Sequence, residues 1–546
     1  MTEVGCARPI GDLLHKSSAT VFMGLSLDIA ESERKQAIGV KSLLVLSSFV
    51  YALTWVFLPL MVNTTLNRDT IQIVYWGLEW QPGFFKHPPL ISWVSEVAIR
   101  LFGASDAVIY GLSVAVMLSS FGFIHRLARR YLDSMGAALA VVTLPVLGYY
   151  SYIVPHFNHN IALNLPWCAA IWFAYLAIEE RRGWAWPLLG LALGAGILSK
   201  YTILILPLLF LIHVVATPQH RWVLHSPRVW GAVGLCLLVA GPHLYWLVTH
   251  GLGPLRYLSS GAGLSDDTFL DRHLVNPAAA LLTMAGMCAS LMIALVGGLG
   301  LPKLQPARWC SKDRFLLLVG LGPAALVTIL SAITGGGLRV EWAASFFLPL
   351  PILLLRLFYP PPTPWRINRL LAWTSGLMVA MATTYVLIFT GIIADMDEGK
   401  WSRFPDRPLA AAAADGWSQV CNTPVPVIIA DAWLGGTASF RLRERPRVYS
   451  EADSQMAPWL SDEDIRSSGA LILWDQALNG RYRDIDHQDA PRPGEPLDWF
   501  PGIPALEARF GPITVLPDVT LDYPGPVAQA PVVLGRAVIP PARPCR

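Results

Sequence analysis

Long apolar segments with almost no charge constrain this chain more than any other feature. A helix that crosses the hydrocarbon layer of a bilayer needs about 20 apolar residues. Only 14% of the residues here are charged, whereas soluble domains carry about 25%. The chain is therefore predicted to be a polytopic α-helical membrane protein with about 11 transmembrane helices. The expected spans are 42–62, 106–124, 134–154, 161–179, 184–199, 200–216, 229–248, 276–298, 314–334, 343–358 and 368–393.

The positive charges predict which loops face the cytoplasm, because cytoplasmic loops carry an excess of Lys and Arg. The rich loops contain Arg126, Arg129, Arg130, Arg181, Arg182, Arg221, Arg228, Lys303, Arg308, Lys312, Arg314, Arg366 and Arg369. We therefore expect residues 1–40 to be a cytoplasmic segment of an inner-membrane protein. No short basic start leads into an apolar run, so the first span is expected to be an uncleaved anchor. An odd number of spans then places the carboxyl terminus on the periplasmic side.

Residues 395–546 differ in character from the transmembrane part at 41–394. Short apolar runs bounded by Gly, Pro or Asp are expected to be strands, and polar stretches between them are expected to be helices. The strands are expected at Val425–Ala430, Arg447–Tyr449, Ala470–Trp474, Ile513–Leu516 and Val532–Leu534, and the helices at Ala432–Arg443 and Ser461–Arg466. The alternation predicts an α/β periplasmic domain. Cys421 and Cys545 fall in it and could form a disulfide in an oxidising compartment.

The first external loop, 63–105, is rich in aromatic residues of the kind found at the lipid headgroup level. We expect short helices lying along the membrane at Thr70–Trp80 and Leu90–Leu101. The Pro88-Pro89 pair between them stiffens the turn, because each proline fixes one φ angle. An ordinary amphipathic connector is the alternative interpretation, but it does not explain the charges inside the loop.

Asp69, Lys86 and His87 are the candidates for function among the polar residues of this loop, because charge beside a bilayer tends to mark function. A carboxylate at such a boundary can act as a general base. Lys86 and His87 can donate to a phosphate held at the turn, where stabilising negative charge is usually the larger catalytic effect. In the structural alternative, Asp69 pairs with Arg68 or Lys86 and only holds the loop.

Further cations are expected on the same side, where they could surround a phosphate or diphosphate. They are Lys200, Arg256, Arg272 and Arg339. Arg339 is the strongest candidate, because Gly335–Gly337 lets the backbone approach a ligand closely. Arg256 and Arg272 fit phosphate binding and surface solvation equally well.

A second polar cluster is predicted at the turn between the third and fourth spans. It contains His156, Asn158, His159 and Asn160. Histidines three residues apart can bind zinc, but no Cys or carboxylate nearby in sequence completes a site. We therefore interpret the cluster as donors and acceptors for sugar hydroxyls and assign no metal ligand. No cofactor is required by the sequence, and dependence on a divalent metal is left open.

These motifs together resemble a known family. Lys86-His87-Pro88-Pro89-Leu90, Phe157-Asn158-His159-Asn160 and Leu198-Ser199-Lys200-Tyr201 are similar to the bacterial polyprenyl-phosphate-dependent glycosyltransferases of the GT-C fold. That family includes the aminoarabinose transferase of lipid A, lipopolysaccharide galacturonosyltransferases and relatives of protein O-mannosyltransferases. The resemblance covers about residues 40–395 in layout.

The resemblance implies transfer of a sugar from a polyprenyl-phosphate carrier to a lipid-linked glycan, such as lipid A or lipopolysaccharide core. It implies an inverting hexosyl- or pentosyltransferase in which Asp69 is the base, Lys86 binds phosphate and His87 assists Lys86. The family often has a second acid near the start of the fourth span, where this chain has Asn160. The expected partners are the donor, the acceptor and membrane lipids.

Three alternatives remain. A protein O-glycosyltransferase differs only in its acceptor. A transporter or flippase for a lipid-linked glycan should show internal repeats and broken helices, whereas no comparable halves occur here. A scaffold using residues 395–546 for binding does not explain the loop charges. Nucleic acid is not an expected partner, because the net charge is only +3 and no basic patch is evident.

Overall fold

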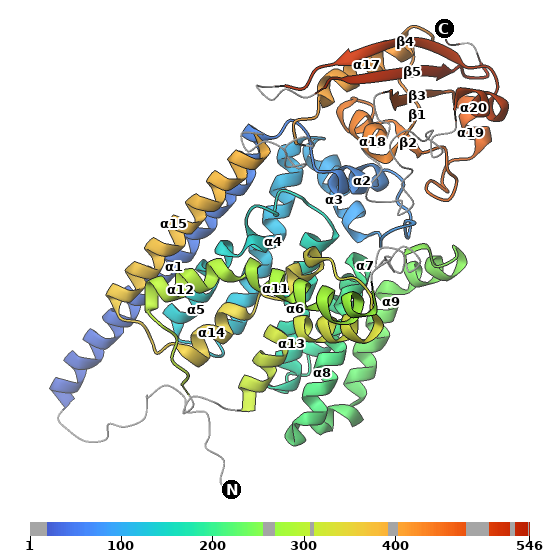
Figure 1. Ribbon diagram of the computed structural model, residues 1–546. Helices are drawn as coiled ribbons and strands as arrows, with labels where there is room; N and C mark the ends of the chain where they lie inside the picture. The colour runs from blue at the N-terminus through green and yellow to red at the C-terminus, as the bar shows by residue number, and fades with distance from the viewer. Residues whose placement is uncertain are drawn as a thin grey trace.

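A computed structural model of the protein describes residues 19–254, 268–305, 311–390, 402–476, 502–524, 530–543 and 545. A helical part is followed by a C-terminal region, 402–545, that contains a sheet (Figure 1). The predicted fold class is confirmed. The long α1 and α15 lie side by side along one flank, and the C-terminal region sits at one end over α2 and α3 (Figure 1).

The helical part is built from helices of very different lengths. They are α1 (Ala19–Val62), α2 (Arg68–Gly77), α3 (Leu90–Phe102), α4 (Asp106–Ala128), α5 (Ser134–Val142), α6 (His159–Ile178), α7 (Ala185–Ser199), α8 (Ile205–Ala216), α9 (Pro227–Thr249), α11 (Asn276–Met287), α12 (Ala289–Leu299), α13 (Ser311–Thr334), α14 (Leu350–Phe358) and α15 (Pro364–Phe389). Short 3-10 segments connect several of them, at η1 (Leu144–Val146), η2 (Gly148–Tyr150), η3 (Tyr201–Leu204), η4 (Pro218–His225) and η7 (Val340–Ser345), and η5 (Asp271–Val275) is a short π-helix.

Each predicted span contains a helix, but the number of full-length helices differs from about 11. Within the described residues, 6 helices are long and apolar enough to cross a membrane, or 7 if the pair α11 and α12, bent by 43°, is one span. The expected span 134–154 is wrong as a continuous helix. It ends at Val142 and continues as two short 3-10 turns, since Pro145 lacks the N–H that a helix interior needs. The expected span 343–358 is not one helix either, because it contains the end of the 3-10 segment η7 and the short α14.

The first loop contains two short helices, α2 and α3, as expected, but the aromatic residues Tyr75 and Trp76 of α2 are buried inside the protein and do not lie at a surface. Both have one apolar face, and α2 is buried from Thr70 to Gly77. At the amino end, α1 is longer than expected, because the helix begins at Ala19 while its apolar part runs over Ile38–Val62.

The C-terminal region contains one five-stranded sheet, and every strand expected from the sequence is present. The strands are β1 (Val427–Ala430), β2 (Arg447–Ser450), β3 (Ala470–Asp475), β4 (Thr514–Leu521) and β5 (Val532–Ile539). Their order is β2-β1-β3-β5-β4, with β1 parallel to β2 and β3, and β5 antiparallel to β3 and β4. The helices α18 (Ala432–Arg441) and α19 (Asp462–Ser468) were expected. The helices α17 (Asp406–Ser418) and α20 (Ile503–Phe510) were not.

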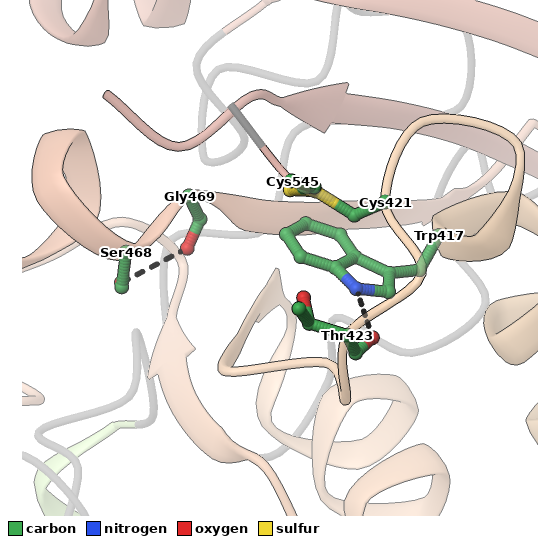
Figure 2. The surroundings of a disulfide bond; sticks show 6 residues. All are labelled: Trp417, Cys421, Thr423, Ser468, Gly469 and Cys545. Atoms are coloured by element: carbon green, nitrogen blue, oxygen red, sulfur yellow. Dashed lines mark hydrogen bonds between the residues drawn. A yellow bond between two sulfur atoms is a disulfide. The ribbon is translucent and has the colours of Figure 1, made fainter. Parts of the chain in front are cut away.

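Cys421 and Cys545 form a disulfide, which confirms the pairing considered from the sequence. It ties the end of the chain to the turn after α17 (Figure 2). In that turn the indole of Trp417 donates to the carbonyl of Thr423 at 2.7 Å. The other cysteines of the described residues, at 168, 236 and 288, are buried and free.

Candidate functional site

Asp69 is placed by the first turn of α2. Asn67 caps this helix, and its side-chain oxygen accepts the backbone N–H of Asp69 at 3.0 Å, as N-cap residues commonly do. The Asp69 side chain is half-buried. Its negative charge reaches His156 and Lys200, which lie far away in sequence. Folding therefore joins the first loop to the turns before α6 and after α7.

Arg68, the neighbour of Asp69, faces the C-terminal region. Its charge acts on Asp431, whose side chain caps α18 by accepting the N–H groups of Trp433 and Leu434 at 2.8 and 3.0 Å. Burial raises the pKa of Asp431 to about 6, although the backbone N–H of Leu434 and the charge of Arg68 oppose the shift. Arg68 thus contributes to the contact between α2 and α18.

The Pro88-Pro89 turn brings Lys86 and His87 against the start of α6. The rings of His87 and His159 lie 3.9 Å apart between centroids, and the His159 ring hydrogen-bonds the carbonyl of Pro88. The backbone of the loop closes on itself where the Phe84 N–H donates to the His87 carbonyl at 3.1 Å. Lys86 and His87, predicted to bind phosphate, therefore lie in one site with His159 of the second polar cluster.

His87 is electrically neutral near pH 7. Burial lowers the pKa of His87 well below its ordinary value, and the charges of His159, Lys86 and Lys200 lower it further. The side chain of Lys86 is itself only 6% exposed. His87 can therefore offer a hydrogen bond to an anion but not a positive charge, which Lys86 and Lys200 supply.

Lys200 lies at the junction between α7 and η3, directed toward the same site. Its amine donates to the side-chain oxygen of Asn160 and lies 5.3 Å from the ring centroid of Trp342. Burial lowers the pKa of Lys200 to about 7, and the attraction of Asp69 and Glu341 does not offset this effect. A group that titrates near neutral pH in such a place is typical of functional sites.

The remaining members of the second polar cluster have different positions. Asn158 is the N-cap of α6, and its side-chain oxygen accepts from the N–H groups of Asn160 and Ile161 at 2.9 and 3.3 Å. This oxygen holds the helix start rather than facing a ligand. Burial lowers the pKa of His156 to about 4 against the opposing charge of Asp69, so His156 is neutral and lies beside the ring of Phe389.

Arg339 precedes η7 and its charge reaches Lys200. A pocket with mainly apolar walls lies at this place. It is lined by Thr202, Ala280, Met284, Val327, Leu338, Arg339, Val340, Trp342, Ala343 and Phe346. Arg272 lies close to this segment in space, because its Cβ is next to Gly335. Arg256 lies outside the described residues.

Two residues of the site were not singled out from the sequence. Glu341 and Trp342 follow Arg339 directly, and both act on Lys200. Their position after the Gly-rich segment was the available signal, but a sequence does not show that this segment folds against the residue after α7.

The chain is similar to several known proteins. Residues 86–246 match the family described as dolichyl-phosphate-mannose-protein mannosyltransferase. The lipopolysaccharide core galacturonosyltransferase RgtA of Rhizobium johnstonii is 23% identical over 77% of this chain and 84% of its own length. The lipid A galacturonosyltransferase RgtD of the same organism is 24% identical over 58% of this chain and 66% of its own length.

The fold is also found in a solved structure. ArnT from Cupriavidus metallidurans, determined with bound undecaprenyl phosphate, superimposes with a TM-score of 0.57. The match has 13% sequence identity and covers 90% of this chain and 97% of ArnT. This shared fold confirms the expected GT-C architecture for almost the whole chain.

Proposed function

We propose a specific reaction for this chain, which is a multi-pass membrane protein with the fold of ArnT and lipopolysaccharide galacturonosyltransferases among its relatives. The chain would transfer one sugar from a polyprenyl-phosphate carrier to a hydroxyl of lipid A or lipopolysaccharide core. Residues 41–394 would carry the chemistry at the periplasmic face. The amino terminus would be cytoplasmic, and residues 395–546 would form a periplasmic domain.

The observation that carries this proposal is the convergence of a carboxylate with several phosphate-binding groups. Asp69 and Lys86 come from the first loop, Lys200 from the end of α7 and Arg339 from the segment before η7. The transfer needs a base that removes the proton of the acceptor hydroxyl. It also needs cations that stabilise the departing phosphate.

The proposed step is a single displacement that inverts the anomeric carbon. The acceptor oxygen forms a bond to that carbon and gives its proton to Asp69. The bond from the anomeric carbon to the phosphate oxygen breaks, and its electron pair goes to the phosphate. Lys86, Lys200 and Arg339 stabilise the resulting charge, while neutral His87 donates a hydrogen bond.

The test is mass spectrometry of lipid A and core glycans from cells with wild-type protein, a deletion, or Asp69→Asn. The control is Asp522→Asn, which changes an exposed carboxylate in the C-terminal region. Loss of the general base should lower turnover by about 10²–10⁴-fold. One sugar should therefore be absent from the deletion and from Asp69→Asn but present in Asp522→Asn at equal protein levels. A sugar retained in Asp69→Asn would remove Asp69 as the base.

Transfer to protein is the second candidate, because the matching family is described as a protein mannosyltransferase. The acceptor is the only difference between the two reactions. Unchanged lipid A and core in the deletion, together with loss of sugar from periplasmic proteins, would favour this second reaction.

A further inference from the structure

A buried group of two histidines and one carboxylate lies away from the candidate site. Glu179 directly follows α6, His213 lies in the last turn of α8, and His220 lies in η4. The Nε2 atoms of His213 and His220 lie 2.6 and 3.1 Å from the same oxygen of Glu179. The side chains are 3% exposed for Glu179, 1% for His213 and 8% for His220.

The group is remote from Asp69 and its neighbours. His159 begins α6 and Glu179 follows its end, so the two are about 30 Å apart at 1.5 Å per residue. In Figure 1, α8 lies at the end of the molecule away from the C-terminal region. The flanking loops contain Arg181, Arg182 and Arg221, which by the charge rule predict the cytoplasmic face.

The three ligand atoms converge on one point. They lie within 4.8 Å of one another, and both imidazoles meet the same carboxylate oxygen although a carboxylate offers two. Ligands around a tetrahedral zinc, at about 2.0–2.1 Å from the metal, are about 3.3 Å apart. The Nε2 atoms lie 2.6 and 3.1 Å from the Glu179 oxygen, which is closer than this value, so the side chains would have to move slightly apart to admit an ion.

Hydrogen bonding within the group leaves polar atoms unused. Nδ1 of His213, Nδ1 of His220 and the hydroxyl of Thr217 are buried without a hydrogen-bond partner among the described residues. Buried polar groups of this kind usually bind water. They are not the ligand atoms, so the case for an ion rests on the two Nε2 atoms and the Glu179 oxygen that face one another.

We propose that Glu179, His213 and His220 bind one zinc ion. Two histidine nitrogens and a glutamate oxygen are a three-ligand set that zinc accepts, with the fourth position left to water. The ion would join the end of α6 to α8 and η4 on the face opposite the candidate active site. Its role would be to hold these three segments together, independent of the proposed transfer reaction.

The test uses the full-length protein in detergent, stripped with EDTA and dialysed against zinc chloride. Bound zinc is measured by elemental analysis, and thermal unfolding is followed with and without zinc. We expect one zinc per chain and a higher Tm with zinc. Glu179→Gln and His220→Gln should each weaken binding at least tenfold, whereas His225→Ala, which changes an exposed histidine in the same turn, should bind zinc normally.

Cobalt substitution gives a second readout, because tetrahedral cobalt has a distinctive visible absorption that does not depend on enzyme activity. The variant His159→Ala shows whether zinc binds instead at the pair formed by His87 and His159. The proposal is overturned if the wild-type protein binds no zinc, if Glu179→Gln and His220→Gln bind it normally, or if only His159→Ala loses it. If Glu179→Gln does not fold, His220→Gln decides the outcome.

Discussion

Arg447 in β2 donates three hydrogen bonds to the carboxylate of Glu79, just beyond α2. Its Nε and Nη2 atoms lie 3.0 and 2.7 Å from the two oxygens of Glu79. The Glu79 side chain is only 5% exposed, and burial raises its pKa although Arg447 opposes the shift. The C-terminal region is thereby tied to the helix that begins beside Asp69.

Replacing Arg447 by Met should destabilise the protein, because it leaves a buried carboxylate without its partner. Complete loss of a buried pair costs about 3–5 kcal/mol. Since the Arg447 side chain is 41% exposed, we expect a smaller loss of about 1–3 kcal/mol. Thermal unfolding in detergent measures this loss. The control Arg443→Met changes an exposed arginine nearby, and equal effects of the two changes would contradict the role of the pair.

Gly436 allows α18 to approach α2 closely. A Cβ at this position would lie 2.5 Å from a side-chain carbon of Ile71 and 2.7 Å from one of Tyr75. Gly436→Ala should therefore shift α2 and with it Asp69, lowering kcat by about 10-fold or more, since small misplacements at an active site are costly. Gly502→Ala, whose Cβ would meet only Pro504 at 3.7 Å, is the control. If the activity of Gly436→Ala is unchanged, the packing of α18 does not determine the position of Asp69.

Lys200 should set the alkaline limit of donor binding. With its pKa lowered to about 7, the amine is charged below this pH and neutral above it, and only the charged form attracts phosphate. The kcat/KM for the donor should therefore fall as pH rises through about 7. Lys200→Arg should remove this limit, because arginine stays charged.

A change at Asn160 provides the converse test of the same group. Asn160→Asp places a carboxylate against the amine that Asn160 now accepts from, which should move the alkaline limit upward by about one pH unit or more. If the pH dependence of kcat/KM keeps its wild-type midpoint in both Lys200→Arg and Asn160→Asp, a group other than Lys200 causes the loss of donor binding at alkaline pH.

His87 should act as a neutral donor rather than as a cation, because burial and its neighbours lower its pKa well below the ordinary value. His87→Gln keeps an N–H donor and should retain activity within about tenfold, whereas His87→Ala should lose about 10²-fold or more. Steady-state kinetics with the polyprenyl-phosphate donor measures the difference. If glutamine is as harmful as alanine and lysine restores activity, a charge is needed at this position.

The disulfide between Cys421 and Cys545 should stabilise the C-terminal region, because it closes a loop with a sequence separation of 124 residues. Cys421→Ser should lower the unfolding free energy by about 2–5 kcal/mol. Cys236→Ser, at a free cysteine, is the control for thiol labelling. Labelling of Cys545 in wild-type protein from cells with intact periplasmic oxidation would contradict the proposed location of this region.

The sequence by itself determined the class of fold. Apolar length identified the helical part, and the change to short runs bounded by Gly, Pro and Asp placed the strands β1 to β5 within a few residues. Both signals are local, because the length of an apolar run and the turn-forming residues that bound it are read from neighbouring positions. Asp69, Lys86 and Lys200 could be selected for a similar reason, since charges are costly near long apolar segments.

Only the tertiary structure decided which of these residues meet. The pairing of His87 with His159, of Lys200 with Asn160, and of Arg447 with Glu79 joins segments that are distant in the chain. It also decided charge: the burial that makes His87 neutral and lets Lys200 titrate near pH 7 comes from helices packed around them.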